Sequence, residues 1–167
     1  IAFPSIESFV TGADGVPDFA GERFIYFGDQ ANMPYGNYAK RGRELFLREL
    51  IVKDAVFLLG RRYHSGGVLK SDKPPVKAIV IACNTATAAA VNELRLQHPG
   101  IPVVGVEPGV KPAAQGSVSK RIAVLATETT ARSERLARLI REHAGQSSVE
   151  IVPCPGWATR VETLHLD

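Results

Sequence analysis

The chain has few cysteines, and their number and spacing exclude two classes of protein. It contains 2 cysteines in 167 residues, too few for the disulfide framework that stabilises small secreted domains. Cys83 and Cys154 also lack the Cys-x-x-Cys or histidine-paired spacing of a zinc site. We therefore expect reduced thiols, a cytoplasmic protein and no bound metal.

Long hydrophobic runs and an excess of one charge are also missing. No apolar stretch reaches the roughly 20 residues that cross a bilayer, and the start "IAFPSIESFV" lacks the charged-then-apolar order of a signal peptide. Lys and Arg number 20 against 17 Asp and Glu, a formal net charge of +3, and the charges are interspersed. The sequence therefore favours neither a membrane nor a nucleic acid as partner.

The common motifs for nucleotides and for metal or triad chemistry are absent too. The sequence has no Gly-x-Gly-x-x-Gly after a strand and no Gly-x-x-x-x-Gly-Lys-[Ser/Thr], so it lacks the usual phosphate-binding loops. It has 4 histidines, and their positions form no metal cluster and no Ser/His/Asp arrangement. We expect structural or solvated roles for His64, His98 and His143, while His165 lies two residues from the chain end.

What the sequence does contain is an alternation of strand and helix patterns, which predicts an α/β fold with a mostly parallel sheet. The segment 60–75 is rich in turn residues and is expected to be an exposed loop. The predicted strand 76–83 is apolar except at Lys77, and this nearly continuous apolar character predicts burial on both faces. The predicted strands are 23–29, 76–83, 101–110, 120–127 and 149–156, and the predicted helices are 39–59, 86–97 and 131–145. The buried faces are expected to include Leu45, Val52, Val56 and Leu59 in the first helix and Leu136, Leu139 and Ile140 in the last.

Small polar or reactive residues follow the ends of the predicted strands. Open α/β sheets bind ligands outside the carboxyl ends of their strands, so these groups are candidates for one shared cleft. They are Gly28 and Asp29, Cys83 to Thr85, Thr127 with Thr129 and Thr130, and Cys154.

The stretch "VKAIVIACNTATAAAVNELR" places Cys83 where a strand ends and a helix begins. Unpaired backbone N–H groups and the positive end of the helix dipole favour a thiolate at this position, which would serve as a nucleophile or a base. The alternative is a buried thiol that packs as a small hydrophobe.

The other polar positions also leave two interpretations open. Asp29 is either an acid–base group or ammonium anchor, or it caps a turn. Tyr35 and the amides near Gly36 and Asn37 either hold a carboxylate or serve packing. The threonines of "ATETT" either bind an anion or cap the following helix.

Five stretches in order make the chain resemble a known family. They are "FIYFGDQANMPYG", "AIVIACNTATA", "IPVVGVEPGVKPA", "IAVLATETTARS" and "PCPGWATRVE", and together they span Phe24 to Glu162. They resemble the glutamate racemases of the aspartate/glutamate racemase superfamily. The resemblance implies a two-lobed parallel-sheet fold with helices on both faces, whose first lobe is residues 1–107. Residues 108–167 would be part of a second lobe that is truncated here.

The resemblance also implies a reaction and a set of site residues. Glutamate racemases interconvert L- and D-glutamate without a cofactor and supply D-glutamate for peptidoglycan. Two cysteines flank the substrate α-carbon, one removing a proton and the other returning one to the opposite face. Cys83 would be the first of that pair and Glu162 a supporting acid. The expected substrate-binding residues are Asp29, Pro34, Tyr35, Gly36, Asn37, Asn84, Thr85, Thr127 and Thr130.

The chain departs from the family pattern at two functional motifs and at one loop. The N-terminal stretch "ESFVTGADG" is not the family's Asp-Ser-Gly motif, and the family's second cysteine, in a Cys-Thr-His motif, would lie beyond residue 167. Cys154 falls in a separate Pro-Cys-Pro segment and does not replace it. The loop 60–75 resembles an insertion. An aspartate or hydantoin racemase, a non-catalytic descendant that binds an acidic amino acid or a partner protein, and a homodimer all stay open.

Overall fold

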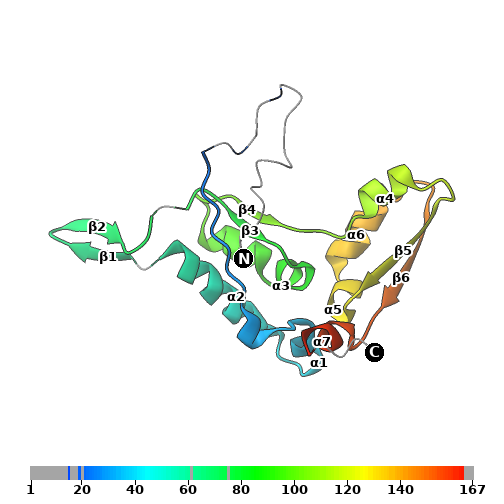
Figure 1. Cartoon of the computed structure of the whole chain (residues 1–167), viewed down its shortest axis with the longest axis horizontal. Coiled ribbons are helices and arrows are strands. Elements are labelled where there is room, and N and C mark those ends of the chain that lie inside the picture. Colours follow the sequence, from blue (N-terminus) through cyan, green and yellow to red (C-terminus); the bar gives the residue numbers. More distant parts are fainter. Residues whose placement is uncertain (1–14, 16–18, 20, 61, 75, 164–167) are drawn as a thin grey trace.

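The computed structural model describes residues 15, 19, 21–60, 62–74 and 76–163, which form two lobes joined by an extended linker (Figure 1). Of the stretch "ESFVTGADG" only Gly15 is described, and His165 lies outside the described residues. Each lobe holds a pair of parallel strands and its own hydrophobic core. The predicted α/β class with parallel strands is confirmed.

The first lobe is built on the parallel strands β3 (Ile79–Ile81) and β4 (Val103–Gly105), with Ile79 opposite Val103. Helix α3 (Asn84–Gln97) connects the two strands and packs on them, and α2 (Glu44–Leu59) packs on α3. Apolar side chains from all four elements exclude water from one core, which is the main stabilising contribution to such a lobe. The buried members are Leu47, Ile51, Ala55, Ile79, Ile81, Ala86, Ala90, Val91, Leu94 and Val103.

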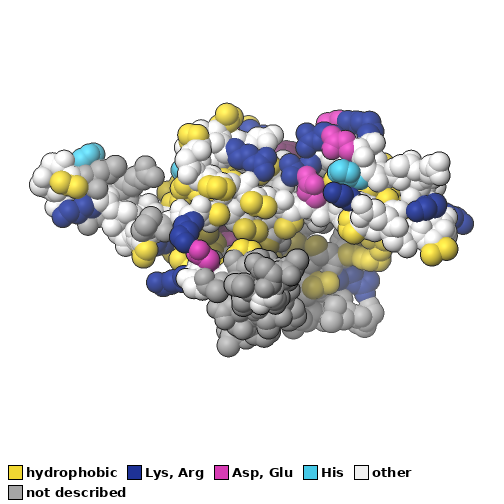
Figure 2. Space-filling view, turned by 90° about the horizontal axis from the view of Figure 1, so that it is seen from above, with side chains coloured by type: hydrophobic (Ala, Val, Ile, Leu, Met, Phe, Trp, Pro, Cys, Tyr) yellow, Lys and Arg dark blue, Asp and Glu magenta, His cyan; other side chains and the backbone are white. Residues whose placement is uncertain are grey.

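One face of the β3–β4 sheet remains exposed. Val80 is 65% exposed and Val104 52% exposed, while their neighbours Ile79 and Val103 point into the core because side chains alternate along a strand. Hydrophobic side chains are visible over this lobe in Figure 2. The prediction that residues 76–83 are buried on both faces is therefore wrong, and the regular strand is limited to Ile79–Ile81.

The second lobe contains the parallel strands β5 (Arg121–Ala126) and β6 (Ser148–Pro153). Its helices are α4 (Val110–Gly116), α5 (Glu128–Ala131), α6 (Glu134–His143) and α7 (Trp157–Glu162). Leu136 and Leu139 of α6 are buried with Val110 and Val124, and Ile140 packs against them. The predicted apolar face of this helix is confirmed. The predicted helix 131–145 is divided, because Ser133 caps a new helix by accepting the Leu136 N–H at 3.2 Å.

The predicted helix 39–59 is also two helices, α1 (Gly36–Lys40) and α2. They are separated at Gly42, whose φ of 63° belongs to the left-handed region that glycine adopts readily. The buried face of α2 was predicted correctly at Val52 and Leu59, which pack against the core, and wrongly at Leu45 and Val56. Leu45 is 71% exposed and Val56 43% exposed, whereas Leu47, Ile51 and Ala55 face the core.

Within the predicted loop, residues 62–71 form a β-hairpin. Strands β1 (Arg62–Ser65) and β2 (Val68–Ser71) pair antiparallel, with Ser65 opposite Val68. The connecting Gly66 and Gly67 both have positive φ, 61° and 76°, as a two-residue type I′ turn requires. The hairpin projects from the end of the first lobe (Figure 1).

The predicted strand 23–29 is not formed. Residues 23–29 have no regular structure and lead into the short helix η2 (Gln30–Asn32). A strand needs a neighbour for its backbone hydrogen bonds, and no strand in the described part of the chain pairs with this segment. The side chains from Phe24 to Phe27 are exposed.

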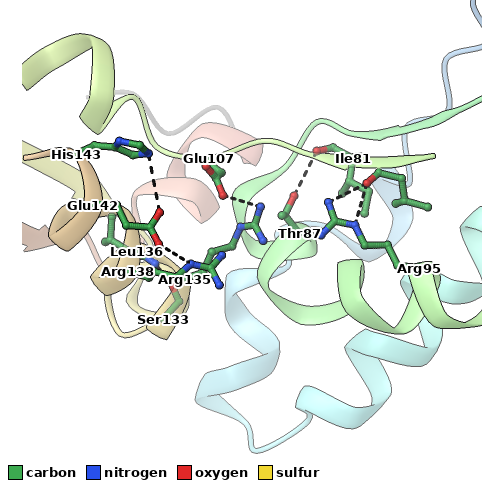
Figure 3. A network of polar contacts seen from close by, with 11 residues as sticks. Ile81, Thr87, Arg95, Glu107, Ser133, Arg135, Leu136, Arg138, Glu142 and His143 are labelled. Carbon is green, nitrogen blue, oxygen red and sulfur yellow. Dashed lines mark hydrogen bonds and ion pairs between the residues drawn. The ribbon is translucent and has the colours of Figure 1, made fainter. Parts of the chain in front are cut away.

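The contact between α3 and β4 is unusually close at one point. Thr87 is fully buried, and its hydroxyl donates to the Ile81 carbonyl oxygen at 3.3 Å (Figure 3). A Cβ placed on Gly105 would lie 2.3 Å from Thr87 Cγ2. Arg95 of the same helix donates from Nε and Nη2 to the Val103 carbonyl at 3.1 and 3.0 Å. The absence of a side chain at Gly105 therefore sets how closely α3 approaches the sheet that carries Cys83.

Candidate active site

A cleft of about 500 Å³ lies where the two lobes meet. The first lobe contributes the residues that begin α3, and the second lobe contributes the start of α4, one side of β5 and the start of α5. The lining residues are Cys83, Asn84, Thr85, Pro108, Gly109, Val110, Ala113, Ile122, Ala123, Val124, Leu125, Ala126, Thr127 and Thr130.

Cys83 is the N-cap residue of α3. Its backbone is extended, with φ −142° and ψ 124°, and its Sγ accepts a hydrogen bond from the Ala86 N–H at 3.5 Å. The side chain is half-buried and lines the cleft. A cap residue satisfies one of the N–H groups left unpaired at a helix start, so the helix holds the thiol at the cleft with a donor directed at its sulfur.

Three threonine hydroxyls connect the two lobes beside Cys83. Thr85 Oγ1 lies 3.2 Å from Thr127 Oγ1, which in turn donates to Thr130 Oγ1 at 3.3 Å. Thr127 also caps α5, since its Oγ1 accepts the Thr130 N–H at 3.4 Å. Thr85 and Thr130 are buried. The structure thus brings together the cysteine and threonine motifs, which are 42 positions apart at Thr85 and Thr127.

The segment 34–37, which we call the substrate loop after the role that the sequence leads us to expect, lies between the first lobe and the second. A Cβ on Gly36 would lie 3.3 Å from Thr127 Cβ, so the loop backbone packs on the threonine of the cleft. Asn37 Nδ2 donates to Thr159 Oγ1 of α7 at 3.2 Å. Just beyond, Lys40 pairs with Glu128 at 3.3 Å. These contacts hold the loop against the lobe opposite Cys83.

Tyr35 of the substrate loop contacts two carboxyl groups. Its hydroxyl lies 2.8 Å from Asp29 Oδ2 and 3.1 Å from Asp54 Oδ2, and Asn32 Nδ2 donates to Asp29 Oδ1 at 2.7 Å. Burial, followed by the hydrogen bond to Asp29, raises the pKa of Tyr35 above its usual range. Burial also raises the pKa of Asp54, and the Asp29 charge adds to the shift against the opposing hydrogen bond from Tyr35. Sequence reasoning missed Asp54, which is 19 positions from Tyr35 in the middle of α2.

The raised pKa of Asp54 predicts a pH dependence of stability. A carboxyl whose pKa rises on folding contributes stability below the unfolded pKa of about 4, and this contribution is lost as pH increases through the folded pKa. Asp54→Asn, which stays uncharged, should therefore gain free energy of unfolding relative to wild type between pH 4 and pH 7. Urea unfolding of both proteins at each pH measures the difference. If the difference in free energy of unfolding between Asp54→Asn and wild type stays constant or shrinks with increasing pH, the raised pKa of Asp54 is contradicted.

Several predicted residues lie outside the lining of this cleft. Asp29, Pro34, Tyr35 and Asn37 are half-buried in or near the substrate loop. Glu162 is exposed at the end of α7. Among the strand-end residues, Asp29 follows no strand, and the half-buried Cys154 follows β6 with its Sγ donating to the Val152 carbonyl at 3.4 Å.

The described residues hold no group of three or more His, Cys, Asp and Glu side chains that could bind a metal ion. Of the histidines in this part, His64 is exposed and His143 lies 4.0 Å from Glu142. None of the helices in this part of the chain is long and apolar enough to cross a membrane.

A second cleft, of about 550 Å³, lies between α2 and α3 of the first lobe and α5 and α6 of the second. Four arginines line it, Arg48, Arg95, Arg135 and Arg138. Arg135 Nη2 pairs with Glu107 of the linker at 2.6 Å (Figure 3). This ion pair connects α6 to the segment that joins the lobes, and nothing in the sequence pattern indicated it.

Two lobes of parallel strands and helices, with a thiol and several hydroxyls in the cleft between them, define a two-lobed α/β protein. The model of the family described as Asp/Glu/Hydantoin racemase matches residues 63–161. The chain belongs to this family.

Individual relatives agree with the family assignment. The chain is 39% identical over 141 residues to the glutamate racemase of Clostridium novyi, an alignment that covers 84% of this chain and 48% of the relative. Its fold is similar to that of Escherichia coli glutamate racemase crystallised with L-glutamate and the activator UDP-MurNAc-Ala (TM-score 0.67, 26% identity, 89% of this chain and 50% of the other). It is also similar to Francisella tularensis glutamate racemase in complex with D-glutamate (TM-score 0.62, 27% identity, 89% and 49%). The chain spans about half the length of these relatives.

Proposed function

We propose that the complete protein interconverts L- and D-glutamate by removing and returning the proton on the substrate α-carbon, with Cys83 as one of two proton-transfer groups. The observation that carries this proposal is the position of Cys83 at the start of α3, on the cleft between the lobes. The relatives described above are glutamate racemases, and two of the related structures contain L- or D-glutamate.

The surroundings of Cys83 suit this chemistry. A proton on a carbon beside a carboxylate is a very weak acid, so the site must stabilise the negative charge that develops as the proton leaves. Asn84 and the hydroxyls of Thr85, Thr127 and Thr130 line the same cleft and supply hydrogen-bond donors. General acid–base action contributes about 100- to 10,000-fold to the rate acceleration. These donors supply part of the remaining acceleration by stabilising the developing charge.

The other predicted residues take supporting roles in the proposal. The substrate loop with Pro34, Tyr35, Gly36 and Asn37 helps to bind the substrate, together with Asp29, and Glu162 assists as an acid. The first lobe is residues 1–107, a division supported by the separate cores on either side of the linker. The second proton-transfer cysteine belongs to a part of the protein outside these 167 residues.

The biological role in the proposal follows from the product. D-glutamate made without a cofactor in the cytoplasm would supply peptidoglycan synthesis, which consumes this D-amino acid. The substrate is a small molecule, and the proposal needs no nucleic acid and no membrane as partner.

Chiral chromatography tests the substrate assignment. The complete protein is incubated, without added cofactor, with L-glutamate, L-aspartate or an L-hydantoin, and the enantiomer ratio is followed. Conversion of glutamate should exceed that of the other two by at least about 100-fold, the discrimination available to a site that hydrogen-bonds the substrate side chain. Faster conversion of aspartate or the hydantoin would overturn the glutamate assignment. Binding of glutamate without any conversion would indicate a non-catalytic protein.

A further inference from the structure

A part-buried hydrogen bond joins the substrate loop to helix α2 of the first lobe. Tyr35 Oη lies 3.1 Å from Asp54 Oδ2, and Asp54 is one position from Ala55, which is buried in the core. The same hydroxyl lies 2.8 Å from Asp29 Oδ2. Tyr35 therefore joins the segment that precedes the loop to a helix anchored in the core.

The number of protons available to Tyr35, Asp29 and Asp54 decides which hydrogen bonds form among these three side chains. A tyrosine hydroxyl has one proton to donate, and ionised carboxylates only accept. Tyr35 can therefore donate to one of the two carboxyl groups, and the shorter contact is the one to Asp29. The hydroxyl lies within donating distance of both carboxylates, so its proton alternates between Asp29 and Asp54. This arrangement requires an acceptor oxygen at position 54.

The contact between Tyr35 and Asp54 is connected to the cleft through the residues that follow Tyr35. Gly36 packs on Thr127, and Thr127 is hydrogen-bonded to Thr85, two positions from Cys83. A change in the position of Tyr35 would move the Gly36 backbone relative to this threonine. The core of the first lobe is thereby connected to the hydroxyls that line the candidate active site.

We propose that Asp54 is a positioning residue that holds the substrate loop in its binding conformation by accepting a hydrogen bond from the Tyr35 hydroxyl. This inference rests on the proposed function only for its kinetic consequence, because the attachment itself is a property of the folded first lobe. The residue acts through Tyr35 and needs no contact with the substrate.

The first experiment measures the attachment without any substrate. Hydrogen exchange is followed at the amides of Asn37 and Tyr38, which bond to the carbonyls of Pro34 and Tyr35 at 3.2 Å each. In Asp54→Ala these amides should exchange about 10-fold faster, as expected for the loss of one hydrogen bond. Asp54→Asn should exchange at the wild-type rate because its amide oxygen can still accept from the Tyr35 hydroxyl. Lys53→Ala, an exposed change on the same helix, is the matched control.

The second experiment measures the kinetic consequence in the complete protein. Asp54→Ala should raise KM for glutamate about 10-fold with kcat changed less than about 3-fold, and Asp54→Asn should restore KM. Tyr35→Phe should have a similar effect, and the double variant Tyr35→Phe/Asp54→Ala should be no worse than Tyr35→Phe alone. A merely structural role would instead lower the amount of active protein, which reduces kcat and leaves KM unchanged.

The two experiments separate failure of this inference from failure of the proposed function. A wild-type protein that converts none of the substrates would overturn the racemase assignment, and the exchange rates would still decide the role of Asp54. Exchange in Asp54→Ala equal to that of Lys53→Ala would overturn the inference. So would an Asp54→Asn protein as perturbed as Asp54→Ala, or additive effects in the double variant.

Discussion

Cys83→Ala should abolish conversion of glutamate in both directions, with kcat reduced by about 100- to 10,000-fold, the range of one general acid–base group. Each direction of a two-group mechanism uses both groups, one to remove the proton and the other to return it. Loss of Cys83 therefore stops conversion from L to D and from D to L alike. Cys83→Ser should be nearly as inactive, because a hydroxyl is a far weaker acid than a thiol and is not ionised near neutral pH.

The second cysteine of the chain is the matched control for this prediction. Cys154 is free and half-buried like Cys83, but it follows β6 and is not part of the cleft lining. Cys154→Ala should retain activity within about 2-fold, as expected for a site away from the reacting atoms. Thermal unfolding of both variants shows whether the fold is intact. A Cys83→Ala protein that converts glutamate at the rate of Cys154→Ala would remove Cys83 from the mechanism.

Gly105→Ala should be strongly destabilising, by about 3 kcal/mol in the free energy of unfolding, the upper end of the usual cost of overpacking. The added methyl group would lie 2.3 Å from Thr87 Cγ2 and 2.9 Å from Thr87 Oγ1. Thr87 is fully buried within α3 and cannot turn away, so the helix must move from the sheet. Urea unfolding followed by circular dichroism measures the loss.

A second substitution identifies the cause of that loss. Thr87→Ala removes both Cγ2 and Oγ1, leaving Thr87 Cβ at 3.1 Å from the added methyl group. The double variant Gly105→Ala/Thr87→Ala should therefore be more stable than Gly105→Ala alone. Gly100→Ala is the matched glycine control, because nothing lies within 4 Å of a Cβ at Gly100. Equal stability of Gly105→Ala and Gly100→Ala would show that the close contact with Thr87 does not destabilise the protein.

The position of Cys83 could be predicted from sequence because it depends on local structure. A β-rich run followed at once by good helix formers places the thiol at a helix start, and the structure makes Cys83 the cap of α3. The convergence of Cys83 with Thr127 follows in outline from the rule that ligands bind at the carboxyl ends of parallel strands. The hydrogen bond between Thr85 and Thr127 does not follow from that rule.

The wrong predictions have physical causes of two kinds. Helix α2 has apolar residues on several sides, so periodicity alone could not separate the buried Leu47 and Ile51 from the exposed Leu45 and Val56. The run 23–29 has strand-forming residues but lacks a paired neighbour in the described part of the chain. The hairpin β1–β2 could have been predicted from Gly66-Gly67, because two glycines between two short strand-like segments are typical of a two-residue turn.

The contact of Asp54 with Tyr35 could not be predicted from the sequence at all. Asp54 occupies a position in α2 where a carboxylate usually faces water, and its partner lies in a loop 19 positions earlier. Only the packing of that loop on α2 brings the two side chains within hydrogen-bond distance. Contacts of this kind depend on the angle between elements, which no local pattern encodes.

Incorporation of deuterium at the α-carbon tests the central claim most directly. The complete protein is incubated in D₂O with L-glutamate and, separately, with D-glutamate, and the Cα signal is followed by NMR. Wild type should exchange the Cα proton of both enantiomers, and Cys83→Ala should lose exchange for at least the enantiomer from which Cys83 removes the proton. Undiminished exchange of both enantiomers in Cys83→Ala would contradict the role assigned to this thiol.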